Sequence, residues 1–142
     1  MKSFATSIVI DAPAQQVWAL LTDLAAWPDW NTTVTRVEGA ATAGSKVTVH
    51  TRSMPGRAFP VKVAELLPPA RMVWTGGIPL GLFTGTRSYV LEPQAGGGTR
   101  FSMQEAFTGL MAPLITQSIP DLQPTFEEFA ACLKTAAERH AT

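Results

Sequence analysis

The chain has 142 residues, and its 11 basic and 11 acidic side chains give a formal net charge of zero at pH 7. A chain of this length fits a single domain covering residues 1–142, and its balanced charge provides no field that attracts nucleic acid or an anionic membrane. Its one cysteine, Cys132, cannot form an internal disulfide, and the two histidines, His50 and His140, lack a zinc-binding spacing. We therefore expect no metal, no cofactor and no nucleic-acid partner.

The N-terminal segment predicts a strand followed by a helix. Residues 4–10 are rich in β-branched side chains, which favour a strand, and their apolar run is too short for a signal peptide or a membrane span. We expect a cytoplasmic protein without stable membrane insertion. Pro13 stands where the first turn of a helix tolerates proline, and one helical face then carries Val17, Leu20, Leu21 and Leu24.

The stretch AWPDWNTTV, residues 26–34, places two of the four tryptophans on either side of a Pro-Asp pair. We interpret it as a loop that closes one side of an apolar pocket. Proline stiffens the backbone, so both rings are expected to be held in place. Trp27 is predicted to anchor inward and Trp30 to border the pocket.

The middle of the chain, residues 32–107, predicts a meander of short antiparallel strands. Turn-forming stretches such as EGAATAGS, SMPGR, LLPPAR and PQAGGGT separate its apolar runs. The clearest strand pair is LFTGTRSYVLEP with TRFSMQEAF, because a glycine-rich turn joins them and each alternates apolar side chains. We predict a hairpin there.

The C-terminal segment predicts one long amphipathic helix, beginning at about Pro120 or Pro124 and ending at Arg139. The region around Pro113 is expected to be an irregular approach to it. One face of this helix carries Phe126, Phe129, Ala130, Leu133 and Ala137. An antiparallel sheet must cover its apolar face, and this helix is the only large amphipathic element available. The sequence therefore predicts an α+β fold in which a curved sheet grips the helix.

The chain resembles the START-like helix-grip superfamily (SRPBCC), in its polyketide cyclase and dehydrase branch. The stretches that carry the resemblance are IDAPAQQVWALLTDLAAWPDWN, VWTGGIPLGLFTGTRSYVLEP, GTRFSMQEAFTG and FEEFAACLKTAAE. The resemblance implies an antiparallel sheet of about seven strands around the C-terminal helix, with short helices after the first strand. It also implies a deep apolar cavity for a lipid, a polyketide or another hydrophobic molecule. Related members often have histidines on the last two strands, where this chain has Arg87 and Met103, so a histidine-based role is not transferred.

The hairpin carries the candidate catalytic residues. If Leu91 pairs with Phe101, the antiparallel register places Tyr89 opposite Met103 and Arg87 opposite Glu105. Two opposite charges then meet on an apolar face. One interpretation is a structural ion pair, because a charge removed from water needs a partner. The other is a site in which Arg87 holds a carbonyl or carboxylate while Glu105 orients it or moves a proton.

Large apolar side chains predict the wall of the pocket. The predicted ligand-binding residues are Trp30, Trp74, Phe83, Tyr89, Phe101, Met103, Phe107, Phe126 and Phe129. For each aromatic residue, ordinary core packing is the alternative. Cys132 has no base motif near it in sequence, which favours a packing role over a nucleophilic one.

Three functions remain open. Binding of a hydrophobic small molecule between the sheet and the C-terminal helix ranks first, because it requires only the pocket. A polyketide cyclase or dehydrase, in which Arg87 stabilises an enolate and either Glu105 or Tyr89 transfers a proton, ranks second. A protein-interaction module that docks through GGIPLGLF or GLMAPL ranks third, and a homodimer is a possible assembly.

Overall fold

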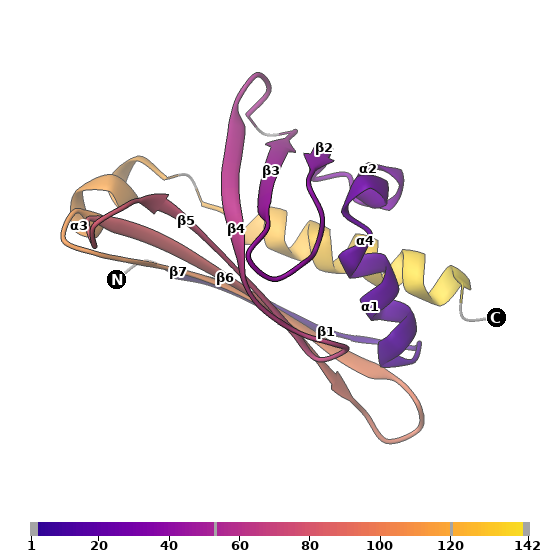
Figure 1. The fold of residues 1–142 in the computed structure, drawn as a ribbon. Coiled ribbons are helices and arrows are strands. Elements are labelled where there is room, and N and C mark those ends of the chain that lie inside the picture. Colours follow the sequence, from indigo (N-terminus) through magenta and orange to yellow (C-terminus); the bar gives the residue numbers. More distant parts are fainter. Residues whose placement is uncertain (1–2, 53, 120, 141–142) are drawn as a thin grey trace.

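The computed structural model describes residues 3–52, 54–119 and 121–140, and Figure 1 shows their arrangement. In chain order the elements are β1 (Ser3–Ile10), α1 (Ala14–Thr22), η1 (Leu24–Ala26), α2 (Trp27–Trp30), β2 (Val34–Glu38), β3 (Lys46–Thr51), β4 (Ala58–Leu67), β5 (Arg71–Ile78), β6 (Phe83–Pro93), β7 (Thr99–Thr108), α3 (Ala112–Ile115), η2 (Thr116–Ser118) and α4 (Gln123–His140). The two η elements are short 3-10 helices.

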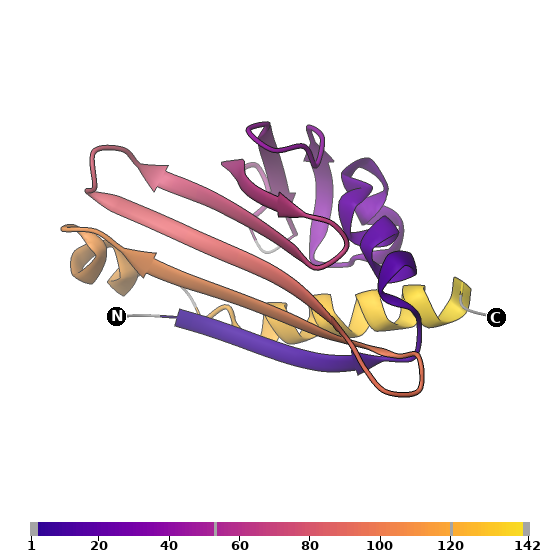
Figure 2. The ribbon, with the colours of Figure 1, turned by 60° about the horizontal axis from the view of Figure 1, so that its bottom comes forward.

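The strands form one antiparallel sheet of seven strands in the order β1-β7-β6-β5-β4-β3-β2. Strands β2 to β7 follow one another as a meander, and β1 adds at the edge beside β7. The register shifts between Val34 and Arg36 in β2 and between Val63 and Glu65 in β4. Such bulges bend a strand and increase its twist. Figures 1 and 2 show the resulting curl, with β2 to β4 rising steeply from the direction of β6 and β7.

Helix α4 packs inside the curl of the sheet, as the sequence predicts. Its apolar face is buried at Phe126, Phe129, Ala130, Leu133 and Ala137. Two hydrogen bonds fix it along the edge strand: Gln123 Nε2 donates to the Ala5 carbonyl at 2.7 Å, and Lys134 Nζ donates to the Val9 carbonyl at 2.9 Å. The structure thus confirms the α+β helix-grip fold, including the short helices after β1 and the irregular approach through α3 and η2.

The tryptophan stretch differs from the prediction, because residues 27–30 form the short helix α2 and not a loop. Pro28 lies in its first turn, where the missing N–H costs no hydrogen bond, and the Asn31 N–H donates to the Trp27 carbonyl at 2.7 Å. A single helical turn is too short to show periodic apolar positions in a sequence. Trp27 is 1% exposed and points into the core, as predicted.

Trp27 lies at the centre of the aromatic core. Its ring stacks on Trp74 with a centroid distance of 5.4 Å and meets Phe129 of α4 edge-on at 5.1 Å. Its Nε1 donates to the Leu21 carbonyl at 3.1 Å, so its polar atom is satisfied. Trp30 is half-buried, and its ring contacts those of Trp27 and Phe129 at 5.9 and 5.7 Å. Among the described residues, no helix has the length and apolar character needed to cross a membrane.

These contacts predict that the two tryptophans of α2 contribute differently to stability. Trp27→Ala should lower the free energy of unfolding by about 3–5 kcal/mol, because it removes a buried ring at the centre of the core. Trp30→Ala should cost only about 1–2 kcal/mol, since its ring is half-buried. Urea denaturation followed by circular dichroism measures both values. Equal losses would show that Trp30 is as much a core residue as Trp27.

Candidate functional site

The site is centred on an ion pair between the two strands of the β6–β7 hairpin. Arg87 on β6 lies directly opposite Glu105 on β7, and Arg87 Nη2 donates to Glu105 Oε2 at 2.7 Å. The register matches the prediction at each pair, with Tyr89 opposite Met103 and Leu91 opposite Phe101. Alternation along the two strands therefore places both charges on the same face of the sheet.

That face is the concave one, against α4. The Arg87 guanidinium lies over the Phe126 ring, 4.9 Å from its centroid, in the geometry of a cation–π contact. Glu105 lies opposite Phe4 of β1, whose ring is 6.1 Å from that of Phe126. The side chains of Arg87 and Glu105 nevertheless stay 27% and 15% exposed. Solvent therefore still reaches a charge pair that is surrounded by aromatic rings.

The surroundings keep Arg87 charged. Burial by itself lowers the pKa of the guanidinium, but the negative charge of Glu105 and the Tyr89 hydroxyl oppose it and raise the pKa overall. The hydrogen bond to Glu105 occupies one of the five N–H donors of a guanidinium. Arg87 thus combines a permanent charge with further donor capacity on a partly open face.

Two buried polar atoms next to the ion pair have no hydrogen-bond partner of good geometry. They are Tyr89 Oη and Trp74 Nε1, which belong to rings 5.2 Å apart. Tyr89 is fully buried, and Trp74 lies opposite Arg87 on β5. An unsatisfied buried donor costs about 1–3 kcal/mol, so native proteins rarely retain one without a reason. Trp27, whose Nε1 is bonded, shows that this core can satisfy an indole.

Tyr89 is held in its neutral form. Burial raises the pKa of its hydroxyl to about 12, although the nearby positive charge of Arg87 acts in the opposite direction. At neutral pH the hydroxyl therefore keeps its proton and can donate it in a hydrogen bond.

The structure places all nine predicted ligand-binding residues on the concave side, in two groups around the ion pair. Trp30, Trp74, Tyr89, Phe101 and Phe129 join Trp27 in the aromatic core. Phe83, Phe107 and Phe126 lie on the other side with Phe4, and the Phe83 and Phe107 rings stack at 5.7 Å. Met103 is buried opposite Tyr89. Trp30 and Phe83 are half-buried, and the other seven are buried.

Sequence reasoning missed two residues of this site. Phe4 was included in the first strand, but its contact with the pair depends on β1 joining β7, which no local pattern reveals. Gly85 lies between Phe83 and Arg87 on the concave face, and a Cβ there would meet the Phe107 ring at 3.3 Å and Glu105 Oε1 at 3.6 Å. Gly85, Arg87 and Tyr89 alternate along the sequence and therefore lie on one face of the strand. This spacing could have predicted a position on the concave face without a side chain.

Two hollows of the described residues lie away from the predicted deep cavity. One hollow, of about 140 Å³, is lined by Thr32, Thr33, Arg52, Thr125 and Glu128. A second, of about 350 Å³, is an open depression lined by residues of β3, β4, β5 and the turn before β3. No predicted site residue lines either of them, and the rings around Trp27 occupy the centre of the space under the sheet. The partly exposed residues of the predicted site are Arg87, Glu105, Trp30 and Phe83.

Cys132 is half-buried on α4, and its Sγ lies 3.4 Å from Thr32 Oγ1, which also donates to the Glu128 carboxylate. Within residues 3–52, 54–119 and 121–140, no three side chains of histidine, cysteine, aspartate or glutamate lie together in a way that could hold a metal ion.

Solved structures share this architecture at low sequence identity. A START superfamily protein from Mycobacterium smegmatis superimposes with a TM-score of 0.71 at 13% identity, over 96% of this chain and 97% of that chain. A norcoclaurine synthase point mutant from Thalictrum, in complex with a transition-state analogue, gives 0.75 at 12% identity over 99% and 96%. The di-domain ARO/CYC protein BexL gives 0.71 at 17% identity over 95% of this chain and 46% of that chain.

No curated protein sequence matches the chain. A family model described as polyketide cyclase / dehydrase and lipid transport matches residues 1–138, almost the full length. The chain therefore belongs to the polyketide cyclase/dehydrase and lipid transport family.

Proposed function

We propose that this protein binds an apolar small molecule that carries a carbonyl or carboxylate group, on the concave face between the sheet and α4. The observation that carries the proposal is the pair of unsatisfied buried donors, Tyr89 Oη and Trp74 Nε1, beside the partly exposed Arg87. A ligand oxygen provides the acceptor that the two buried donors lack, and Arg87 has further N–H donors beyond the one bonded to Glu105.

The chemistry of the face suits such a molecule. Aromatic rings on both sides of the ion pair offer the large apolar contact area typical of small-molecule sites. Few polar groups are present among them, so those few determine which ligand is preferred. A hydrocarbon without oxygen would leave the donors unsatisfied, and a strongly polar molecule would gain little from the rings.

Related folds support the proposal without defining the ligand. The norcoclaurine synthase holds a transition-state analogue, and BexL is a di-domain ARO/CYC protein from a biosynthetic pathway. Both share the fold with this chain at under 20% identity. Tyr89 and Trp74 are buried, so a ligand must displace part of the aromatic packing to reach them.

A second candidate, a cyclase- or dehydrase-type enzyme, is favoured by the contact between Glu105 and Arg87 next to a neutral tyrosine. Glu105 would remove a proton from the carbon next to a bound carbonyl, and the Arg87 guanidinium would stabilise the enolate oxygen that results. The enolate carbon would form the new carbon–carbon bond by attacking a second carbonyl of the same molecule, and Tyr89 would protonate the alkoxide oxygen that forms. The proton held by Glu105 would then pass through solvent to Tyr89, which restores both residues. Turnover of a bound β-diketone, followed by mass spectrometry, separates this candidate from binding alone.

The state of Tyr89 can be measured directly, because it is the only tyrosine of the chain. Its near-ultraviolet absorbance should titrate with a midpoint of about pH 12 in the folded protein and about pH 10 in denaturant. Since the folded pKa lies above the unfolded one, this group's contribution to stability is complete below about pH 10 and is lost as the pH rises toward 12. A folded-state midpoint near 10 would show a solvated hydroxyl and remove Tyr89 from the site.

The role of the ion pair is tested with three matched probes: 2-naphthoate, 2-acetylnaphthalene and 2-ethylnaphthalene. The wild-type protein should bind the two oxygen-bearing probes about tenfold or more tightly than the hydrocarbon, since hydrogen bonds to a charged group contribute about 1.5–3 kcal/mol. Isothermal titration calorimetry measures the three affinities. In the double variant Arg87→Met/Glu105→Leu this preference should disappear.

The double variant is chosen because Arg87→Leu alone leaves Glu105 without its partner. That loss should cost about 1–3 kcal/mol, less than for a fully buried pair, because both side chains remain partly exposed. Replacing both charges by apolar groups avoids this cost, so thermal melting should show a folded protein. A folded double variant that still prefers the oxygen-bearing probes would assign the pair to structure only.

A further inference from the structure

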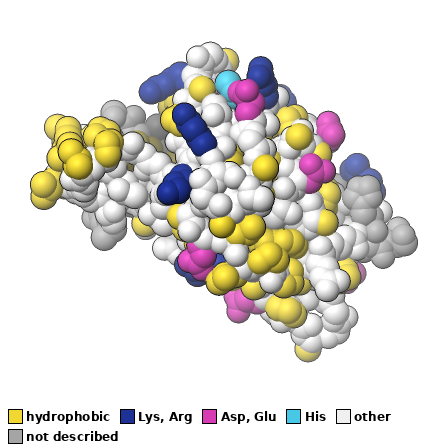
Figure 3. Space-filling view, viewed as in Figure 1, with side chains coloured by type: hydrophobic (Ala, Val, Ile, Leu, Met, Phe, Trp, Pro, Cys, Tyr) yellow, Lys and Arg dark blue, Asp and Glu magenta, His cyan; other side chains and the backbone are white. Residues whose placement is uncertain are grey.

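The chain exposes a cluster of large apolar side chains at one end of the sheet. We call it the apolar tip: the β5–β6 turn, residues 78–82, together with residues 109–115, which follow β7 and include α3. Its most exposed members are Leu80 at 92%, Leu110 at 85% and Leu114 at 67%. Figure 3 shows hydrophobic side chains gathered at the end of the molecule where Figure 1 places α3. Contiguous exposed apolar surface of this kind marks interaction sites in folded proteins.

The backbone holds the apolar tip in a defined shape. The Met111 N–H donates to the Leu82 carbonyl at 2.7 Å, and the Leu110 N–H donates to the Gly81 carbonyl at 3.2 Å. Gly109 permits this approach, because its φ is +113° and a Cβ there would lie 2.6 Å from the Leu82 oxygen. The two turns are thus joined by hydrogen bonds, and their leucines project together.

Leu80 shows that the exposure has a cost. Its φ is +66°, a left-handed conformation that side chains other than glycine adopt rarely. The turn therefore keeps a leucine where glycine would relieve the backbone strain and where a polar side chain would suit the solvent. A function of the apolar tip would explain why Leu80 combines a strained backbone with an exposed apolar side chain.

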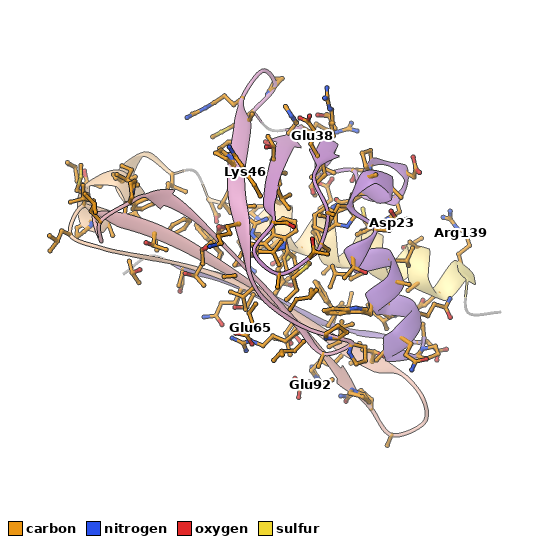
Figure 4. The ribbon with its side chains drawn as sticks, in the orientation of Figure 1. Asp23, Glu38, Lys46, Glu65, Glu92 and Arg139 are labelled. Carbon is orange, nitrogen blue, oxygen red and sulfur yellow. The ribbon has the colours of Figure 1, made fainter. Side chains whose placement is uncertain are left out.

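The apolar tip carries no charge. The sequence has no acidic or basic residue from Gly76 to Thr86 or from Ala106 to Pro120. Figure 4 places charged side chains on the body of the molecule, away from α3, including Asp23, Glu38, Lys46, Glu65, Glu92 and Arg139. A partner recognised by charge is therefore a poor match for this surface.

We propose that the apolar tip docks onto the surface of a lipid bilayer and inserts its leucines among the acyl chains. A stable protein interface surrounds its apolar centre with a polar rim, and the apolar tip has no charged residue to provide one. A bilayer needs no complementary shape and accepts apolar side chains singly. The Phe83–Phe107 ring pair lies directly behind the tip, so the docked end is also the end nearest Arg87 and Glu105.

The test is cosedimentation of the full chain with phosphatidylcholine vesicles. Wild-type protein should pellet with the vesicles equally at low and high salt, because the contact is apolar and the lipid has no net charge. The double variant Leu80→Glu/Leu110→Glu should bind at least tenfold more weakly. The matched control is Leu67→Glu, which changes a leucine that is 54% exposed at the β4–β5 turn and should bind like the wild type.

Three results would overturn the proposal. The first is wild-type protein that stays in the supernatant. The second is a tip variant that pellets as the wild type does, when circular dichroism shows the same melting temperature for both proteins. Analytical ultracentrifugation without lipid gives the third: a dimer that the tip variant dissociates would assign the surface to a second copy of the chain. The readout is protein on vesicles, so it does not depend on any ligand of the concave face.

Discussion

The organisation of this protein depends on placing one ion pair on an apolar face. Arg87 and Glu105 face α4 from neighbouring strands, and each would be costly there without the other. The Phe126 ring covers the guanidinium, and Gly85 leaves space beside the carboxylate. Since both side chains keep some exposure, the pair can serve the fold and still meet a ligand.

The two sides of this pair differ in how tightly the side chains are packed and in how much apolar surface is exposed. On the Trp27 side the rings pack against one another, and the α2 helix and α4 hold them in place. On the Phe83 side the sheet continues past the start of α4 and ends in uncharged turns with exposed leucines. The proposed ligand site and the proposed lipid contact lie along this one direction.

Much of this arrangement was predictable from the sequence, because it follows from periodicity. Alternation along the hairpin gave the register of Arg87 with Glu105, and helical spacing gave the buried face of α4. The helix at residues 27–30 was mistaken for a loop, since one turn has no period. The contact of Phe4 with the site, the unsatisfied Tyr89 hydroxyl and the joined turns of the tip depend on distant chain segments, which local patterns do not report.

The most direct test of the account is a nitrogen–proton correlation spectrum of the four tryptophan indoles during titration with 2-naphthoate, assigned with Trp74→Phe and Trp27→Phe variants. The Trp74 indole has no partner and the Trp27 indole is bonded to Leu21. The account predicts that the Trp74 N–H signal shifts downfield and exchanges more slowly as the carboxylate binds, while the Trp27 signal stays in place. A saturated complex in which the Trp74 signal is unchanged would contradict it.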